Sequence, residues 1–516
     1  MTRHRGWSIG MALLFVWGVL GVASGQPPKA GGTLRVAWEA DITGLDPYVS
    51  AGVQSQWMVG SLFNSLVTLD TDLNIVPDLA ESWEILDNGQ GYVFRLRRGV
   101  KFHEGGDFNA EVVRWNYQRI MDPSEKTFVA PSFAIIEAVD VLDTHTVKFT
   151  LKHPSRTLLP VMAVDRVGFL QMSPASYQKW GKEEVRLHPD GTGPFKLARW
   201  DPNQVVVLDK NPQYFKPGLP YLDRLEFRVM KEGVTRATAL RTAEVDFANY
   251  IPREHVERLV KDPNMQVFRG KDMQRVQSFF NLLKPTFQDV RVRQALLGYG
   301  IDREAIVKTA LLGQGQPLWS FVPPGGKDHI DFGEIYPYNP DKAKALLKEA
   351  GFGDRNRLHY TIMTHSAEPA LPTIATIMKT QLAKLGVDVT VEVLDRPVFL
   401  RRLTKDRDWD QTLNFSGAVS DAYTIARVID TRAGNNTSNH DDKHVDALID
   451  RLREAPTEEA YLKAGHELQR YVVAEKMYYL SVSTLPFFQA ARTYVKGYEN
   501  LYGLKIRFET TWLDKQ

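Results

Sequence analysis

Stretches in which hydrophobic and polar residues alternate recur through the first half of the chain. In residues 33–38, the side chains of Leu34, Val36 and Trp38 fall on one side. Alternation with a period of two predicts a strand that buries this face. The same kind of pattern predicts further strands at residues 92–97, 147–151, 205–208, 225–229 and 245–248.

Apolar residues at helical spacing follow two capping signals. Asn109 can cap a helix that ends at Asp122-Pro123, and Asn339-Pro340 opens another helix. Gly351 stands where a left-handed C-cap belongs. A further helix is expected at residues 234–242.

One segment of the second half has the pattern of a strand-helix-strand unit. Residues 358–363 and 387–393 predict two strands, and residues 373–385 predict the helix between them. Such a unit pairs its strands in parallel with a right-handed crossover. Ligands of open α/β sheets lie beyond the carboxyl ends of parallel strands, where Thr364, His365 and Ser366 are expected.

The first 25 residues have the layout of a secretory signal peptide. Arg3 and Arg5 precede an apolar run at residues 9–22, and Ala23-Ser24-Gly25 supplies small residues for cleavage. The run has about 14 residues, whereas a membrane span needs roughly 20. We therefore expect residues 1–25 to be a signal peptide cleaved near Gly25; the alternative is a retained anchor helix.

Composition narrows the class of protein. A chain of 516 residues, 43% hydrophobic and 24% charged, is expected to form two or three domains. Removal of Arg3 and Arg5 leaves 62 basic and 62 acidic residues, a balance that argues against a nucleic-acid partner. The absence of cysteine excludes disulfides, a cysteine nucleophile and a lipid anchor on cysteine. The mature protein is expected to be soluble and periplasmic.

The sequence offers little support for catalysis. It has no signature of a serine hydrolase, zinc protease, phosphate loop or dinucleotide site. His440, Asp441, Asp442 and His444 resemble metal ligands, but their polar run at residues 435–444 favours a turn and a helix cap. His103-Glu104 precedes two glycines and also favours a turn. We expect no enzyme activity, no metal and no cofactor.

Many short motifs follow one another in the order of a known family. The motifs are Gly32-Thr33-Leu34-Arg35-Val36, Leu45-Asp46-Pro47, Pro77-Asp78-Leu79-Ala80-Glu81-Ser82-Trp83, and residues 92–103, 191–195, 211–215, 243–246, 280–281, 290–296, 301–303, 343–347 and 350–352. Together they resemble the family 5 extracellular solute-binding proteins of ABC importers, which include peptide, nickel and oligopeptide receptors. The resemblance covers nearly all of the mature chain.

The resemblance implies an α/β, two-lobed periplasmic binding protein fold, class II-like, with an extra domain inserted in the first lobe and the ligand cleft between the lobes. Domain I is then expected at residues 26–65, 190–284 and 488–516, domain II at 66–189 and domain III at 285–487. Crossings near 281–285 and 485–488 form the expected hinge. Closure of the lobes around a solute presents the closed form to a membrane permease.

The resemblance also implies a small-molecule or peptide ligand and ABC permease subunits as partners, with the protein itself a monomer. Peptide-binding members place an aspartate in domain III, in a loop that matches residues 409–423 here. The family's aspartate falls near Val419, and Asp421 follows two residues later. Asp421 either contacts the ligand's amine or caps the helix that begins at Ala422.

Most candidate ligand-binding residues follow predicted strands or belong to that loop, and Trp57 and Asn281 are added from elsewhere. Trp57 and Phe415 either stack on the ligand or pack in the core. They are Trp38, Glu39, Asp41, Trp57, Asn281, His365, Asn414, Phe415, Ser416, Asp421 and Tyr423. The ligand class stays open between a short peptide, a glycoside or opine-like conjugate, and a metal chelate. A secreted hydrolase with carboxylate catalysis is the alternative from another class, and a sensor kinase is an alternative partner.

Overall fold

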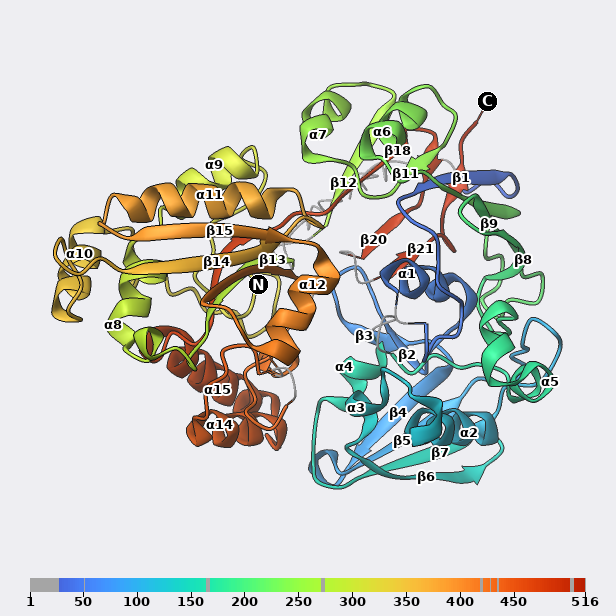
Figure 1. The fold of residues 1–516 in the computed structure, drawn as a ribbon. Coiled ribbons are helices and arrows are strands. Elements are labelled where there is room, and N and C mark those ends of the chain that lie inside the picture. The colour runs from blue at the N-terminus through green and yellow to red at the C-terminus, as the bar shows by residue number, and fades with distance from the viewer. Residues whose placement is uncertain are drawn as a thin grey trace, which may run out of the picture.

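The computed structural model describes most of the chain after the predicted signal peptide, which lies outside the described residues. The described residues are 27–50, 52–163, 168–270, 274–417, 421–426, 428–433, 436–501 and 505–515. In Figure 1, one half of the molecule contains a five-stranded sheet, and the other half contains a seven-stranded and a four-stranded sheet.

The seven-stranded sheet is assembled from three distant parts of the chain, in the order β12-β18-β11-β1-β10-β9-β8. Its strands are β1 (Thr33–Trp38), β8 (Phe195–Asp201), β9 (Val205–Lys210), β10 (Arg224–Val229), β11 (Phe247–Ala248), β12 (Met265–Arg269) and β18 (Phe488–Arg492). The central strand β1 pairs in parallel with β10 and β11.

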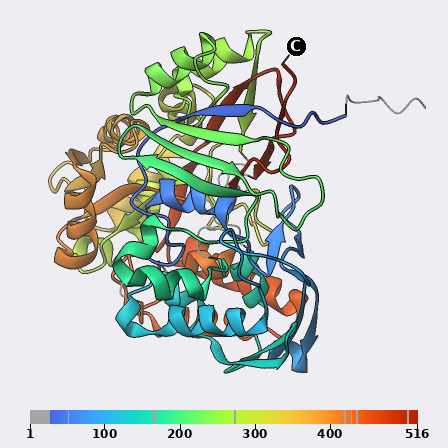
Figure 2. The same ribbon diagram turned by 90° about the vertical axis from the view of Figure 1, so that its right-hand side faces the viewer.

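Ala37, on the second face of β1, is buried as well, whereas the alternating pattern predicts one buried face. Leu34 and Val36 pack with helix α1 (Val53–Leu62), which lies beneath the strands of the sheet in Figure 2. Ala37 packs on the opposite face, in the cluster that contains helices α6 (Gly233–Arg241) and α7 (Arg253–Val260). Alanine is small enough to let a helix pack on this face. Because alanine is only weakly hydrophobic, the sequence pattern does not indicate that this face is buried.

The five-stranded sheet has the order β15-β14-β16-β13-β17. Its strands are β13 (Arg275–Phe280), β14 (His359–His365), β15 (Asp388–Leu394), β16 (Gln411–Ser416) and β17 (Leu480–Thr484). Strands β14 and β15 pair in parallel around helix α11 (Ala370–Ala383), which confirms the strand-helix-strand prediction. The first strand runs two residues beyond the expected 363, so Thr364 and His365 belong to it.

The sequence predicted that the chain first crosses between the lobes near residues 281–285. This prediction is wrong, because the crossing lies one strand earlier, before β13. Strand β13 pairs with β16 and β17 in the five-stranded sheet, so the chain leaves the seven-stranded sheet between Arg269 and Arg275. The return crossing at 485–487 agrees with expectation. The two crossings lie side by side, because Leu485 N–H donates to the Gln274 carbonyl and Gly270 N–H donates to the Phe487 carbonyl. The connection between the two large sheets is therefore double-stranded.

The four-stranded sheet lies within the segment expected to be inserted. It comprises β4 (Ala80–Leu86), β5 (Gly91–Leu96), β6 (Ile136–Asp143) and β7 (Thr146–Leu151). Helix α2 (Ala110–Met121) packs on it, with Asn109 accepting from Val112 N–H as the predicted cap. The remaining helices of this half are α3 (Ala130–Phe133), α4 (Leu158–Ala163) and α5 (Pro174–Glu184). The boundaries of the three domains stay a prediction.

Short hairpins and a helical layer complete the described fold. The two-stranded pairs are β2 (Val67–Leu69) with β3 (Ile75–Pro77), β19 (Val495–Lys496) with β22 (Trp512–Leu513), and β20 (Glu499–Leu501) with β21 (Lys505–Arg507). The helices around the five-stranded sheet are α8 (Val290–Arg293), α9 (Arg303–Ala310), α10 (Pro340–Glu349), α12 (Arg396–Arg401), α13 (Ala422–Ala426), α14 (Lys443–Arg453) and α15 (Glu458–Gln469). Asn339 caps α10, and Gly351 has the expected positive φ of 89°.

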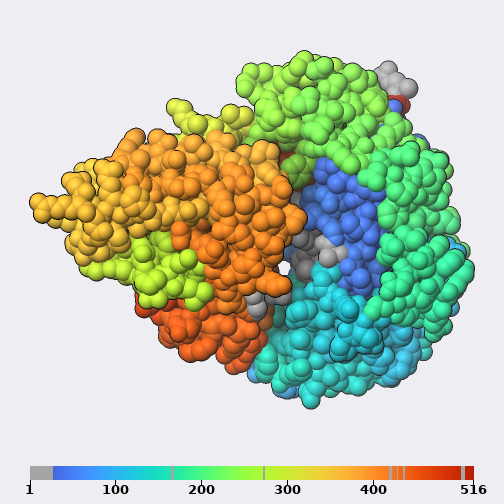
Figure 3. Space-filling view, viewed as in Figure 1, coloured from blue at the N-terminus to red at the C-terminus, as the bar shows by residue number. Residues whose placement is uncertain are grey.

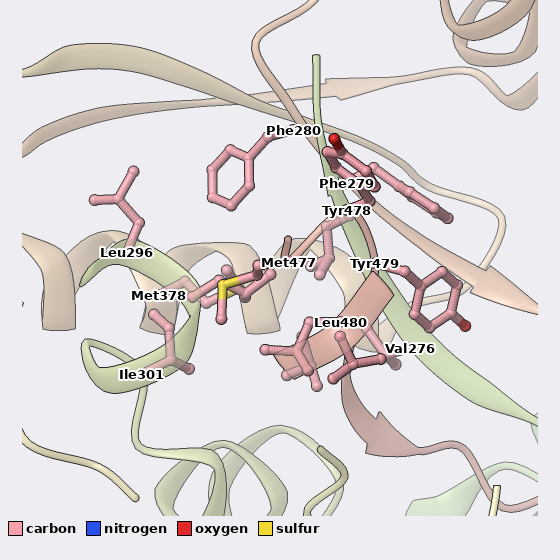
Figure 4. Packing of buried hydrophobic residues seen from close by; sticks show 14 of the residues in the cluster. Val276, Phe279, Phe280, Leu296, Ile301, Met378, Met477, Tyr478, Tyr479 and Leu480 are labelled. Atoms are coloured by element: carbon pink, nitrogen blue, oxygen red, sulfur yellow. The ribbon is translucent and has the colours of Figure 1, made fainter. Parts of the chain in front are cut away.

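The largest hydrophobic core packs against the five-stranded sheet. Figure 4 shows Phe280 of β13 and Leu480 of β17 beside Met378 of α11 and Met477. Phe280, Leu480 and Met378 are at most 1% exposed. The five-stranded and the seven-stranded sheets thus have separate cores, with no described buried residue common to the two clusters.

Candidate ligand-binding cleft

The carboxyl ends of the parallel strands in the two large sheets meet across the middle of the molecule. Strands β14, β15 and β16 are mutually parallel, as are β1, β10 and β11. Figure 3 shows a hollow between the half that carries the five-stranded sheet and the half that carries the other two. Ligands of such sheets bind beyond these ends, so the hollow is the candidate cleft.

A buried ion pair joins the two edges at one side of the cleft. Arg253 Nη1 lies 2.8 Å from Glu368 Oε1, with side chains 16% and 1% exposed. Tyr250, which follows β11, donates from Oη to Glu368 Oε2 at 3.4 Å. Glu368 follows β14, so the contact links the ends of two parallel strands from different sheets. At another point Arg156 Nε donates to the Pro456 carbonyl at 2.9 Å.

Arg236 fixes the backbone at the edge of the seven-stranded sheet. Its guanidinium donates to the carbonyls of Met230, Lys231, Asn249 and Tyr250, which follow β10 and β11. Tyr250 has a φ of 54°, a left-handed conformation that is rare for a bulky residue. Strained backbone that is held by its surroundings is common at ligand sites. Arg236 therefore keeps Tyr250 aimed at the opposite edge.

Glu39 is a carboxylate that receives only neutral donors. It follows β1 and accepts from Gln54 Nε2 at 3.1 Å and from Asn249 Nδ2 at 2.9 Å. Burial raises the pKa of the Glu39 carboxyl above its ordinary value. Within the part of the chain that the structure describes, no residue forms an ion pair with Glu39, although the positive charge of Arg236 offsets a small part of the rise in its pKa. A ligand ammonium would meet an acceptor already in place.

Asp41, Trp38 and Trp57 are engaged within the protein. Asp41 accepts from Trp200 Nε1 at 3.0 Å and from Asn203 N–H at 2.7 Å. Trp38 and Trp57 are 1% and 5% exposed and pack edge to face, with ring centroids 6.0 Å apart. The two indoles belong to the core of this half and offer little surface to a ligand.

The edge of the five-stranded sheet brings together His365, Asn414, Phe415 and Ser416. His365 Nδ1 accepts from Ala367 N–H, so the neutral ring donates from Nε2 to Asn414 Oδ1 at 2.9 Å. Burial lowers the pKa of His365, which favours this neutral form. The Asn414, Phe415 and Ser416 side chains are partly exposed at the end of β16.

Asn281 does not join this edge. Because β13 runs antiparallel to β16, its carboxyl end lies at the opposite edge of the sheet. The Asn281 amide donates to the carbonyls of Arg407 and Trp409 and is 0% exposed. Its side chain holds a loop in place.

Asp421 caps helix α13. Its carboxylate accepts from Thr424 N–H at 2.9 Å and from Tyr461 Oη at 3.0 Å. Burial, and then the negative charge of Asp421, raises the pKa of nearby Asp328 to about 7. Tyr423 is partly buried against the core of this half. Val419, where the family's aspartate falls, lies outside the described residues.

The two polar clusters considered for catalysis or metal binding have structural partners. Asp442 caps α14 by accepting from His444 N–H at 3.0 Å, and His440 stacks on Tyr478. Within the described ranges no group of metal-binding side chains occurs. His103 Nε2 donates to the Gly193 carbonyl at 3.1 Å, and burial lowers its pKa to about 4.

Several residues at the two edges were not among the sequence candidates. They are Tyr250, Arg253, Arg275, Glu368 and Arg396. Asn249-Tyr250 directly follows the predicted strand 245–248, and the rule on carboxyl ends could have selected it. No local sequence pattern identifies Arg275 as a residue of this edge, because its position there depends on the direction in which β13 runs.

No helix among residues 27–515, their gaps aside, is long and apolar enough to cross a membrane. Two surface depressions lie away from the facing edges. One lies against α2, and the other lies at the amino ends of β14 and β15.

Comparisons with known proteins agree with this architecture. The family model for bacterial extracellular solute-binding proteins, family 5 Middle, matches residues 74–437. The glutathione-binding protein GsiB of Escherichia coli O1:K1 / APEC is 34% identical over 363 residues, which are 70% of this chain and 69% of that protein.

Two solved structures cover nearly the whole chain. The periplasmic binding protein DppA from Helicobacter pylori, in complex with the peptide STSA, has a TM-score of 0.80 at 26% identity and covers 94% of this chain and 99% of its own. The binding protein AgaA from A.tumefacien R10, in complex with agropinic acid, has a TM-score of 0.79 at 25% identity with the same coverage. The expected two-lobed fold class is thereby confirmed.

Proposed function

The chain belongs to family 5 of the bacterial extracellular solute-binding proteins, and from this membership we propose that it holds a short peptide between the facing edges of its two large sheets. Members of the family are binding proteins rather than enzymes. The chain is the substrate-binding component of an ABC transporter, for a peptide or a related solute, and works with a membrane permease. We further propose that it acts in the periplasm as a monomer.

The observation that carries the peptide proposal is the unpaired carboxylate of Glu39. A peptide amine is a cation, and a closed cleft must supply it with an anion because an unpaired charge is costly to bury. Asp421 already caps α13, whereas Glu39 accepts only from two neutral amides. We propose Glu39 as the group that receives the amine, with Asn414, Phe415 and Ser416 on the opposite edge.

Closure follows from ligand contacts to both halves. A solute that bonds to Glu39 on one edge and to the end of β16 on the other stabilises the closed arrangement by its differential affinity. The double crossing near residues 270 and 487 is the connection about which the halves turn. The permease then receives the loaded form, and the energy for transport comes from its ATPase.

The test is calorimetry on ligand-free protein with trialanine and with N-acetyl-trialanine. We expect trialanine to bind and the acetylated peptide, which lacks the ammonium, to bind at least about tenfold more weakly. At 100 times its Kd, trialanine should stabilise the protein by about 2.7 kcal/mol. Equal affinity for both peptides would contradict the role of Glu39. Release of a sugar conjugate or metal chelate from gently purified protein, with no peptide binding, would overturn the peptide proposal.

The same titration separates binding from hydrolysis. After incubation, chromatography should recover the peptide intact. Conversion of trialanine into shorter products would favour the hydrolase alternative.

A further inference from the structure

Arg275, the first residue of β13, is a buried cation with too few acceptors. Its side chain is 1% exposed, and its Nε donates to Tyr479 Oη. Its Nη1 is buried and has no hydrogen-bond acceptor. No carboxylate of the described residues pairs with it. A buried guanidinium without an anionic partner is costly to the fold.

Other buried arginines of the described chain have more acceptors than Arg275, although Nη1 of Arg303 also lacks one. Arg119 pairs with two carboxylates. Arg236, Arg293 and Arg303 each donate to three or more backbone carbonyls. Each of these four has at least two acceptors within the fold, whereas the described residues offer Arg275 one, the Tyr479 hydroxyl. The contrast indicates that the acceptor of Arg275 comes from outside the chain.

The position of Arg275 allows a solute to supply this acceptor. It pairs across the sheet with Ser416 and Thr484, the last residues of β16 and β17, so it lies at the edge that borders the cleft. The hinge crossing ends next to it in sequence. Tyr479 donates its own proton to Gln277 Oε1 at 2.9 Å, which leaves its oxygen as the acceptor for Arg275 Nε. The guanidinium is therefore oriented before any ligand arrives.

We propose that Arg275 is a ligand-binding residue that receives a carboxylate of the bound solute on Nη1. A planar guanidinium matches the geometry of a carboxylate, and the bond is strongest where water is excluded. Opening of the hinge admits the anion, and closure buries the pair. This inference rests on the proposed function in taking the cleft as the binding site. It adds a requirement for an acidic group in the solute.

The experiment compares trialanine with its C-terminal amide on the wild-type protein and on Arg275→Met. In the wild type we expect the amide to bind about 30-fold more weakly or worse, because it leaves the buried cation unpaired. In Arg275→Met the two peptides should bind with equal affinity. Arg224→Met, which removes an exposed guanidinium at the amino end of β10, is the control and should keep the wild-type ratio.

The free protein distinguishes a ligand-binding role from a structural one. Removal of an unpaired buried charge should leave the melting temperature of Arg275→Met equal to or above that of the wild type. A lower melting temperature together with an unchanged acid-to-amide ratio would overturn the proposal. Equal affinity of the wild type for acid and amide would also overturn it.

A second probe keeps the inference testable if no peptide binds, an outcome that would refute the peptide proposal. Sodium acetate, compared with sodium chloride at equal ionic strength, should raise the melting temperature of the wild type but not of Arg275→Met. An equal effect of acetate on both proteins would overturn the role of Arg275.

Discussion

The two sheet edges that face each other carry opposite unpaired charges. On the seven-stranded sheet, Glu39 and Asp41 accept hydrogen bonds from neutral N–H groups. On the five-stranded sheet, Arg275 lacks an acidic partner, and the guanidinium of Arg396 lies 4.9 Å from the centre of the Phe415 ring. The difference indicates that each edge is electrostatically incomplete and that a solute with both an amine and a carboxylate would complete both.

The contact between Arg253 and Glu368 is the exception, because here a cation near one edge forms an ion pair with a carboxylate of the other edge. Arg253→Met leaves a 1% exposed carboxylate without its cation. We expect a cost of about 2–3 kcal/mol to the arrangement in which the halves meet. Small-angle scattering should show a larger radius of gyration, and peptide affinity should fall about 30-fold or more. The double variant Arg253→Met/Glu368→Gln should recover most of both losses, and an unchanged scattering profile would contradict the prediction.

Glu39→Gln removes the unpaired acid of the seven-stranded edge. We expect trialanine affinity to fall about 10–30-fold at pH 8. In the wild type, burial raises the pKa of Glu39, so its carboxyl takes up a proton earlier than an ordinary glutamate as the pH falls. Affinity for an ammonium should be full above this raised pKa and be lost as the pH falls through it. Calorimetry across this range should show the dependence in the wild type and a flat profile in the variant.

Substitutions of Asp421 distinguish a role in ligand binding from a role in capping helix α13. Asp421→Ala removes the cap of α13 and should lower the free energy of unfolding by about 1 kcal/mol. Asp421→Asn keeps a good capping group and should be nearly neutral. Both variants should bind trialanine as the wild type does. A loss of affinity in Asp421→Asn, measured by calorimetry, would return Asp421 to the ligand site.

Arg396→Gln gives the smallest expected effect. The residue is exposed, so its charge acts on the approach of an anionic solute more than on the bound state. We expect the association rate to fall about two- to threefold at low ionic strength. Stopped-flow measurements at rising salt should bring the variant and the wild type together, and a difference that persists at high salt would indicate a direct contact.

Local patterns predicted those elements whose partners are near in sequence. The strand-helix-strand unit at residues 358–393 and the caps Asn109 and Asn339 follow from periodicity and capping chemistry. Glu39 was selected from its place after a strand. Trp38 was selected by the same reasoning, and Trp57 as an aromatic that could stack on a ligand, but their rings pack on each other in the core. A sequence pattern does not show which face of a strand end turns toward solvent.

Short motifs in the sequence carried the resemblance to the family, and that resemblance implied the two-lobed fold class. Local hydrophobic periodicity by itself determined where strands end. The tertiary structure alone decided which strand ends meet. The direction of β13 removes Asn281 from the cleft edge and brings Arg275 to it. A charge becomes unpaired only when the rest of the chain is packed around it, so the missing acceptor of Arg275 has no signature along the sequence.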